Sequence, residues 1–111
     1  METYNILKDI ARWHIRSDLE RKTIEKRGGR VLFQARLETN DITIAAENNL
    51  FSIRVNGNVI FNYRTLDFAV RMAQEHGYID EITAAEITKG KAAADKLRRI
   101  HAIRSMLSYK Q

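Results

Sequence analysis

Residues 30–64 read RVLFQARLETNDITIAAENNLFSIRVNGNVIFNYR and decide the fold. Apolar and polar side chains alternate over four short segments of this stretch, and Asn-rich turns separate the segments. Alternation over four to eight residues is typical of a β-strand with one buried face. The stretch therefore predicts a four-stranded antiparallel meander with one apolar face.

The middle hairpin of this meander has the clearest register. Opposed residues on neighbouring strands share a face of the sheet, so each loop must bring the apolar sets together. A two-residue loop at Asn48 and Asn49 does this and pairs Ile44 with Ile53. Because Asn tolerates positive φ angles, we expect a type I′ turn there.

The last hairpin is less simple because two loop lengths compete. The pair Asn56-Gly57 is the usual signal of a two-residue hairpin loop. That loop would place Arg54 beside Val59 and split the apolar set. A three-residue loop over residues 56–58 pairs Val55 with Val59 instead. We therefore predict the three-residue loop.

The two faces of the predicted sheet differ in character. In the first hairpin, a two-residue loop over residues 39–40, or a four-residue loop, pairs Leu37 with Ile42 on the apolar face. The outer face is polar and weakly cationic, with Arg36 and Arg54 about 10 Å apart. We expect helices to cover the apolar face.

One long helix is predicted before the sheet, over residues 4–26. It would span roughly 35 Å, which is more than the width of the sheet, so its second half has room to project. Off its main stripe, Ile15 and Leu19 form an apolar pair that a bend, simple exposure or a partner contact would explain. Gly28 and Gly29 end the helix. The main stripe consists of Ile6, Ile10, Trp13, Ser17 and Ile24, with Leu7 and His14 at its edge.

Two helical segments are predicted after the sheet. Thr65 can cap a helix over residues 66–76, and Gly77 can end it. The sequence from Thr83 to Glu86 matches a capping box, which predicts a final segment over residues 84–108. Gly90 either breaks this segment or lies inside it. The inward stripe of the longer part is predicted as Ala93, Leu97, Ile100, Ile103 and Leu107.

Together these elements predict a single α+β domain over residues 1–111, in the order α-β-β-β-β-α-α. The apolar fraction of 44% and the charged fraction of 30% are ordinary for a soluble globular protein. The sequence has no apolar run of the ~18 residues that a membrane span needs, and no leader pattern. We expect a cytoplasmic protein without a membrane partner.

Charge gives the main indication of function. The net charge is +5, and residues 89–111 carry seven Lys or Arg against one Asp. Such asymmetry indicates a polyanionic partner, and cationic side chains on a helix supply phosphate contacts. We therefore expect a basic protein that binds DNA, RNA or a nucleic-acid-containing complex. The expected contacts are Lys91, Lys96, Arg98, Arg99 and Arg104 in the last helix, and then Arg36 and Arg54 on the sheet.

A third basic surface lies on the first helix, where Lys8, Arg12 and Arg16 form a like-charge ladder. A solvated helix face explains this ladder more simply than a binding role. The sheet offers no single-strand platform, because its aromatic side chains face inward in the predicted register.

Enzyme chemistry has little support in the sequence. His14, His76 and His101 lie in three different helical segments without metal-ligand spacing. The basic glycine loop after the first helix lacks the P-loop pattern. We expect neither catalysis nor a cofactor. The alternative function is a regulator or inhibitor, such as a phage or mobile-element protein acting on a host nucleic-acid-handling machine. It would contact an acidic protein partner through the last helix, or self-associate through apolar helix positions.

Overall fold

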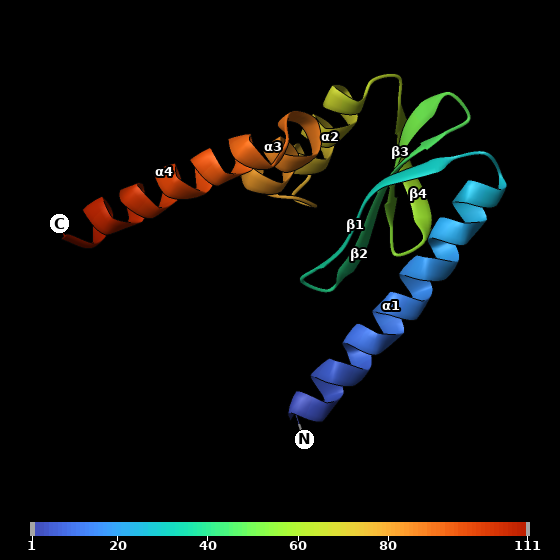
Figure 1. The fold of residues 1–111 in the computed structure, drawn as a ribbon, viewed down its shortest axis with the longest axis horizontal. Helices are drawn as coiled ribbons and strands as arrows, with labels where there is room; N and C mark the ends of the chain where they lie inside the picture. Colours follow the sequence, from blue (N-terminus) through green and yellow to red (C-terminus); the bar gives the residue numbers. More distant parts are fainter. Residues whose placement is uncertain (1, 111) are drawn as a thin grey trace. The chain divides into compact units, whose positions relative to one another are not determined.

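The computed structural model describes the backbone of residues 2–110 and the side chains of residues 5–108. The class is α+β, as predicted, with four antiparallel strands in one sheet (Figure 1). Contacts group the chain into two compact units divided between Ala69 and Val70, and each unit is described by itself. The elements are α1 (Glu2–Lys26), β1 (Arg30–Leu37), β2 (Asn40–Glu47), β3 (Leu50–Val55), β4 (Asn58–Tyr63), α2 (Leu66–Glu75), α3 (Glu81–Lys89) and α4 (Lys91–Lys110).

The sheet is a simple meander in the order β1-β2-β3-β4. Its middle hairpin has the predicted register, with Ile44 opposite Ile53. Asn48 and Asn49 form the two-residue loop, and their φ angles of 52° and 65° are those of a type I′ turn. The twist of this turn matches the twist of the flanking strands, which explains why Asn occupies both positions.

The first hairpin is shifted by two residues from the prediction. Leu37 lies opposite Asn40, and Ile42 lies opposite Ala35. The loop is formed by Glu38 and Thr39, with Glu38 at a φ of 57°. Side chains alternate between the two faces with a period of two. The requirement that apolar residues share a face therefore does not distinguish two registers that differ by two residues.

The predicted three-residue loop of the last hairpin is wrong. Asn56-Gly57 forms a two-residue loop, with φ angles of 52° and 85°. Arg54 therefore lies opposite Val59, and yet Ile53 lies opposite Phe61 as predicted. One extra residue in β4 between these two pairs makes a β-bulge. The bulge, and not a longer loop, gives Phe61 and Tyr63 their predicted partners, whereas Val59 stays opposite Arg54.

Helix α1 lies against the polar face of the sheet, contrary to the expectation that helices cover the apolar face. The Gln34 side chain donates a hydrogen bond of 2.9 Å to the Ser17 carbonyl. The Thr43 hydroxyl donates a hydrogen bond to the Glu20 carboxylate. Near the end of the helix, Ile24 is only 1% exposed. Polar side chains on this face have partners on α1, so the face can be buried without unsatisfied groups.

The centre of the sheet is buried on both faces. On the apolar face, Ile44 and Ile53 are fully buried, and Ile42 is 1% exposed. On the opposite face, Thr43 and Ser52 are 3% and 1% exposed. The core of this unit therefore extends to both sides of the sheet.

The first turns of α1, before the contact of Asp9 with Arg36, project beyond the sheet, whereas the prediction gave the second half room to project. The buried Ile24 and the hydrogen-bonded Glu20 both lie in the second half. The apolar pair Ile15 and Leu19 is exposed. The apolar residues of the first turns, Ile6, Leu7 and Ile10, are also exposed.

Two glycines form the junction between α1 and β1, as predicted. Gly28 has a φ of 86°, and the Gly29 amide donates a 2.9 Å hydrogen bond to the Ile24 carbonyl. A Cβ added at Gly29 would lie 2.8 Å from the Ala46 carbonyl oxygen. The helix end therefore approaches β2 more closely than any larger residue would permit.

Capping of α2 matches the prediction. The Thr65 hydroxyl accepts a 3.2 Å hydrogen bond from the Phe68 amide, which caps the start of the helix. At the other end, Gly77 takes a φ of 80°, and the Tyr78 amide donates to the Ala73 carbonyl at 2.9 Å. This left-handed glycine ends the helix in the expected way.

Helix α3 begins earlier than predicted. Its N-cap is Asp80, whose side chain accepts a 2.7 Å hydrogen bond from the Thr83 amide. Thr83 is therefore not the N-cap, because its own amide lies inside the first turn of the helix and donates to Asp80. Gly90, with a φ of 97°, separates α3 from α4. Of the two predicted possibilities, the final helical segment is therefore broken at Gly90.

The first half of α4 packs against α3. Ala94 is fully buried, and the predicted inward residues Leu97 and Ile100 are half-buried. Further along the same helix, Ile103 and Leu107 are 57% and 60% exposed, so the predicted inward stripe is correct only in its first part. The reason is that α3 is a nine-residue helix and α4 has twenty residues.

Candidate nucleic-acid interface

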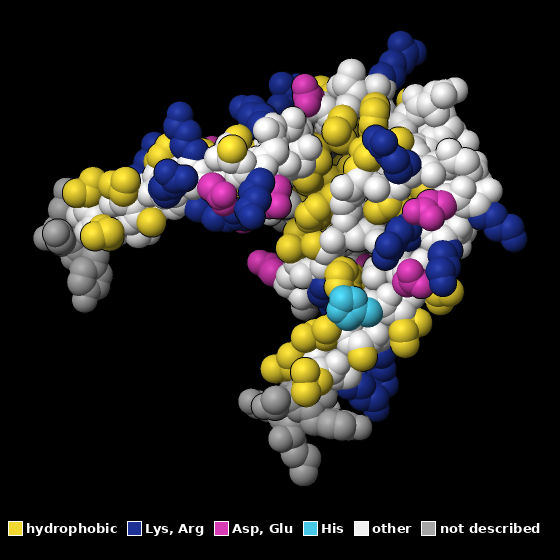
Figure 2. Space-filling view, viewed as in Figure 1, with side chains coloured by type: hydrophobic (Ala, Val, Ile, Leu, Met, Phe, Trp, Pro, Cys, Tyr) yellow, Lys and Arg dark blue, Asp and Glu magenta, His cyan; other side chains and the backbone are white. Residues whose placement is uncertain are grey.

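The predicted cations of the last helix all lie on α4 and are exposed. Dark blue Lys and Arg side chains gather along this helix in Figure 2. Their charges face solvent over a helix of twenty residues. The exposed set is Lys91, Lys96, Arg98, Arg99 and Arg104.

Arg98 differs from the others because it already has carboxylate partners. Its Nη1 atom lies 2.6 Å from Asp95 Oδ1, and its Nη2 atom lies 3.3 Å from Glu86 Oε2. His101 Nε2 also lies 3.3 Å from Glu81 Oε2. Arg98 and His101 thus link α4 to α3, and Arg98 is a weaker candidate for phosphate than its neighbours.

Four cations of α4 make no ion pair with any described side chain: Lys91, Lys96, Arg99 and Arg104. Residues three or four apart lie on the same side of a helix, so Lys96 and Arg99 share one side. Lys91 lies in the first turn of α4 and Arg104 in its second half. The helix therefore presents unpaired positive charge along most of its length.

The sheet arginines lie in a different environment from the one predicted. Arg54 and Glu47 form two hydrogen bonds, from Nη2 to Oε1 at 2.6 Å and from Nε to Oε2 at 3.1 Å. The bond from Arg54 lowers the pKa of Glu47 despite its partial burial, and the same pairing raises the pKa of Arg54. The positive charge of Arg54 is thus matched within the sheet.

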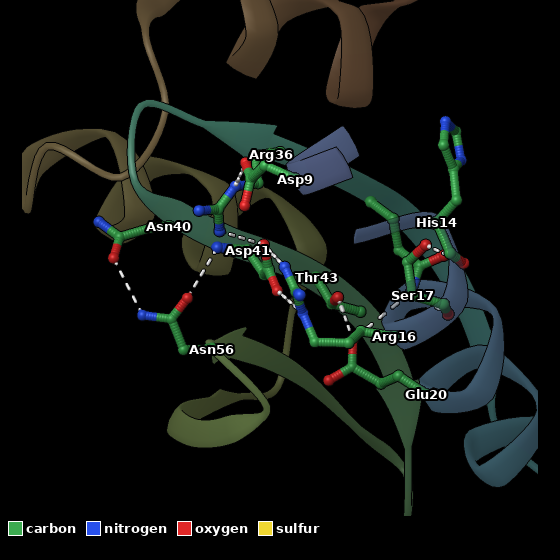
Figure 3. Close-up of polar contacts among 11 residues, drawn as sticks. Asp9, His14, Arg16, Ser17, Glu20, Arg36, Asn40, Asp41, Thr43 and Asn56 are labelled. Carbon is green, nitrogen blue, oxygen red and sulfur yellow. Dashed lines mark hydrogen bonds and ion pairs between the residues drawn. The ribbon is translucent and has the colours of Figure 1, made fainter. Parts of the chain in front are cut away.

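Arg36 belongs to a polar network between α1 and the sheet. Its Nη1 atom lies 2.6 Å from Asp41 Oδ1, and its Nε atom lies 3.3 Å from Asp9 Oδ2. Arg16 Nε approaches the other oxygen of Asp41 at 2.9 Å. Figure 3 shows both arginines directed at Asp41. Arg36 therefore helps to hold α1 on the sheet, and does not stand on an open outer face.

Asp41 is held in its ionised form by this network. Partial burial raises its pKa, but hydrogen bonds from Arg16 and Arg36 outweigh this effect, and the net pKa is lowered. A cleft of about 510 Å³ opens beside these residues, and Trp13 and Asn56 also contribute to its lining. The charges that line the cleft are largely paired with one another.

The pairing on the polar face was missed by the sequence reasoning, although a signal was present. Asp41 and Glu47 are separated from Thr43 by even numbers of residues, so all three lie on the same face of β2. This is the face that carries Arg36 and Arg54. Opposite charges on one face of neighbouring strands attract each other. Counting the acidic residues of this face would have predicted paired arginines there.

Metal binding and membrane crossing are two further possibilities for the described residues. Within residues described by the structure, no three His, Cys, Asp or Glu side chains are grouped so that they could hold a metal ion. None of the helices in the described part of the chain has the length and apolar character that crossing a membrane requires. Comparisons with protein-family models, with curated proteins and with solved structures found no match.

Proposed function

We propose that this chain is a non-enzymatic protein that binds nucleic acid through helix α4. The observation that carries the proposal is the set of four exposed α4 cations that lack an ion pair among the described side chains: Lys91, Lys96, Arg99 and Arg104. An unpaired cation is available for phosphate, whereas a paired one must first leave its carboxylate. For this reason Arg36, Arg54 and Arg98 become secondary candidates.

The proposed contacts are to the sugar-phosphate backbone. Phosphate contacts supply affinity and position the protein, but they carry no sequence information directly. Binding should therefore depend strongly on salt, because each neutralised phosphate releases counterions. Four such contacts correspond to a slope of log K against log salt of about −3 to −4.

The experiment is a titration of nucleic-acid-free protein against labelled duplex and single-stranded oligonucleotides at several salt concentrations, followed by fluorescence anisotropy. Lys96→Ala with Arg99→Ala should reduce affinity and make the salt slope shallower by about 2. The matched control is Lys8→Ala with Arg12→Ala, which removes two exposed charges from α1. Absence of binding at low salt, or an equal effect of both double variants, would contradict the proposal.

A further inference from the structure

The second half of α4 exposes an apolar patch that the proposed phosphate contacts do not use. Ile103, Met106 and Leu107 are 57%, 61% and 60% exposed, and we call these three residues the α4 stripe. Their spacing of three and four residues places them on one side of the helix. Yellow side chains are visible toward the C-terminal end of α4 in Figure 2. Single exposed apolar residues are ordinary, but a contiguous set marks an interaction surface.

Helix α3 does not reach the α4 stripe. The described ion pairs between the two helices are those of Arg98 with Glu86 and of His101 with Glu81, and both lie before residue 102 of α4. From residue 102 to residue 108 every side chain of α4 is exposed. The stripe therefore lies beyond the part of α4 that α3 supports.

The charges around the stripe indicate the chemistry of its partner. Arg99 lies one turn before Ile103, and Arg104 lies next to it in the sequence. No acidic residue occurs between residues 96 and 108. We propose that residues 99–108 dock as a helix into an apolar groove of a partner protein whose rim is acidic. An amphipathic helix with anchors at such spacing is a recurring mode of peptide recognition.

A second copy of this chain is a poorer occupant. A second α4 laid parallel to the first would bring Arg99 and Arg104 close to the same cations of its partner, and an antiparallel one would bring the two Arg104 side chains together; residues 96–108 hold no acidic residue to offset either contact. Like charges across an interface oppose association. The exposed apolar turns of α1 are also flanked by cations, Lys8 and Arg12. Charge complementarity thus favours an acidic protein.

Calcium-loaded calmodulin is a suitable probe, because it presents Met-rich apolar grooves to basic amphipathic helices. Calcium-free calmodulin, whose grooves are closed, serves as the negative control. Binding of the full chain is measured by calorimetry. We expect the calcium-loaded form to bind and the calcium-free form to bind much more weakly.

The variant for this test is Ile103→Gln with Leu107→Gln, which removes two anchors and keeps good helix formers. It should weaken calmodulin binding by at least about tenfold, since two buried apolar side chains are lost. The matched control is Ile15→Gln with Leu19→Gln, an equally exposed apolar pair on α1. This control should leave the affinity unchanged.

Several outcomes would overturn the proposal: no binding to calcium-loaded calmodulin, or equal effects of the two Gln double variants. Stripe-dependent binding to phosphatidylserine vesicles without calmodulin binding would assign the surface to a membrane instead. Stripe-dependent self-association in sedimentation would assign it to a second copy.

A lower melting temperature of the stripe variant would mean that the stripe packs within the chain. Oligonucleotide binding should be unaffected by the stripe variant, which separates this proposal from the proposed function.

Discussion

Arg54 and Glu47 meet side-on across β2 and β3, with two hydrogen bonds and side chains that are only 15% and 14% exposed. A bidentate pair of this kind is stronger and more specific than a surface ion pair. The pair holds Arg54, which was predicted from the sequence as a nucleic-acid contact, in a fixed position within the sheet. The contribution of the pair to the free energy of unfolding can be measured directly.

Glu47→Gln should lower the free energy of unfolding at neutral pH by about 1.5–3 kcal/mol, since hydrogen bonds to a charged group are lost. The pKa of Glu47 is lowered in the folded protein. Its contribution is therefore fully present above the ordinary pKa of a glutamate, and it is lost as the pH falls through the lower folded pKa. Urea unfolding of both proteins from pH 7 to pH 2 should show the difference shrinking with acid. A difference that does not change with pH would exclude this role for the charge.

Gly29→Ala should destabilise the protein by about 1–3 kcal/mol, because the new methyl group would press on the Ala46 carbonyl. Gly28 has open space but a φ of 86°, so Gly28→Asn, which tolerates left-handed backbone, should have a much smaller effect. Urea denaturation compares the two variants. Equal losses would show that the close approach to β2 is not the constraint.

Asp80→Ala should cost about 1 kcal/mol, the usual effect of removing an N-cap. Thr83→Ala should have a smaller effect, because the Thr83 amide that donates to the cap remains and only the Thr83 hydroxyl contact with Asp80 is lost. Thermal melting followed by circular dichroism provides the comparison. If Thr83→Ala is the more damaging change, the helix begins where the capping-box pattern placed it.

Arg98→Ala should affect stability more than binding. Its ion pairs with Asp95 and Glu86 are about half exposed, so their loss should cost less than about 1 kcal/mol. In contrast, Arg99→Ala should leave the melting temperature unchanged and weaken oligonucleotide binding. Anisotropy titrations of the two single variants, together with their melting curves, test this separation. A stronger binding defect for Arg98→Ala would show that its carboxylate partners release it readily.

The strands, their order and the middle hairpin were predictable because side-chain alternation and the number of residues in a loop depend only on residues that are close in the sequence. Parity could not separate Leu37 opposite Ile42 from Leu37 opposite Asn40, since both keep the side chains on their faces. The prediction of the last hairpin also assumed regular strands without bulges. For this reason the loop at Asn56-Gly57 was assigned one residue too many.

The side of the sheet that α1 covers was not predictable from apolar periodicity alone. The contact depends on polar pairs between distant residues, such as Arg16 with Asp41 and Gln34 with Ser17. These pairs also determine which cations remain available. That the α4 cations lack acidic partners was predictable because few acidic residues accompany them in the sequence. The exposed stripe was missed because apolar periodicity predicts which side of a helix is apolar, but not how far a neighbouring helix extends along it.

Both outer strands of the sheet contain an irregularity. β1 changes register between Val31 and Phe33, and β4 contains the extra residue between Val59 and Phe61. A regular edge strand offers unpaired amides and carbonyls to another chain, and a bulge interrupts that template. The β4 bulge that pairs Phe61 with Ile53 therefore also interrupts strand addition at its edge of the sheet, and the irregularity in β1 does so at the other edge.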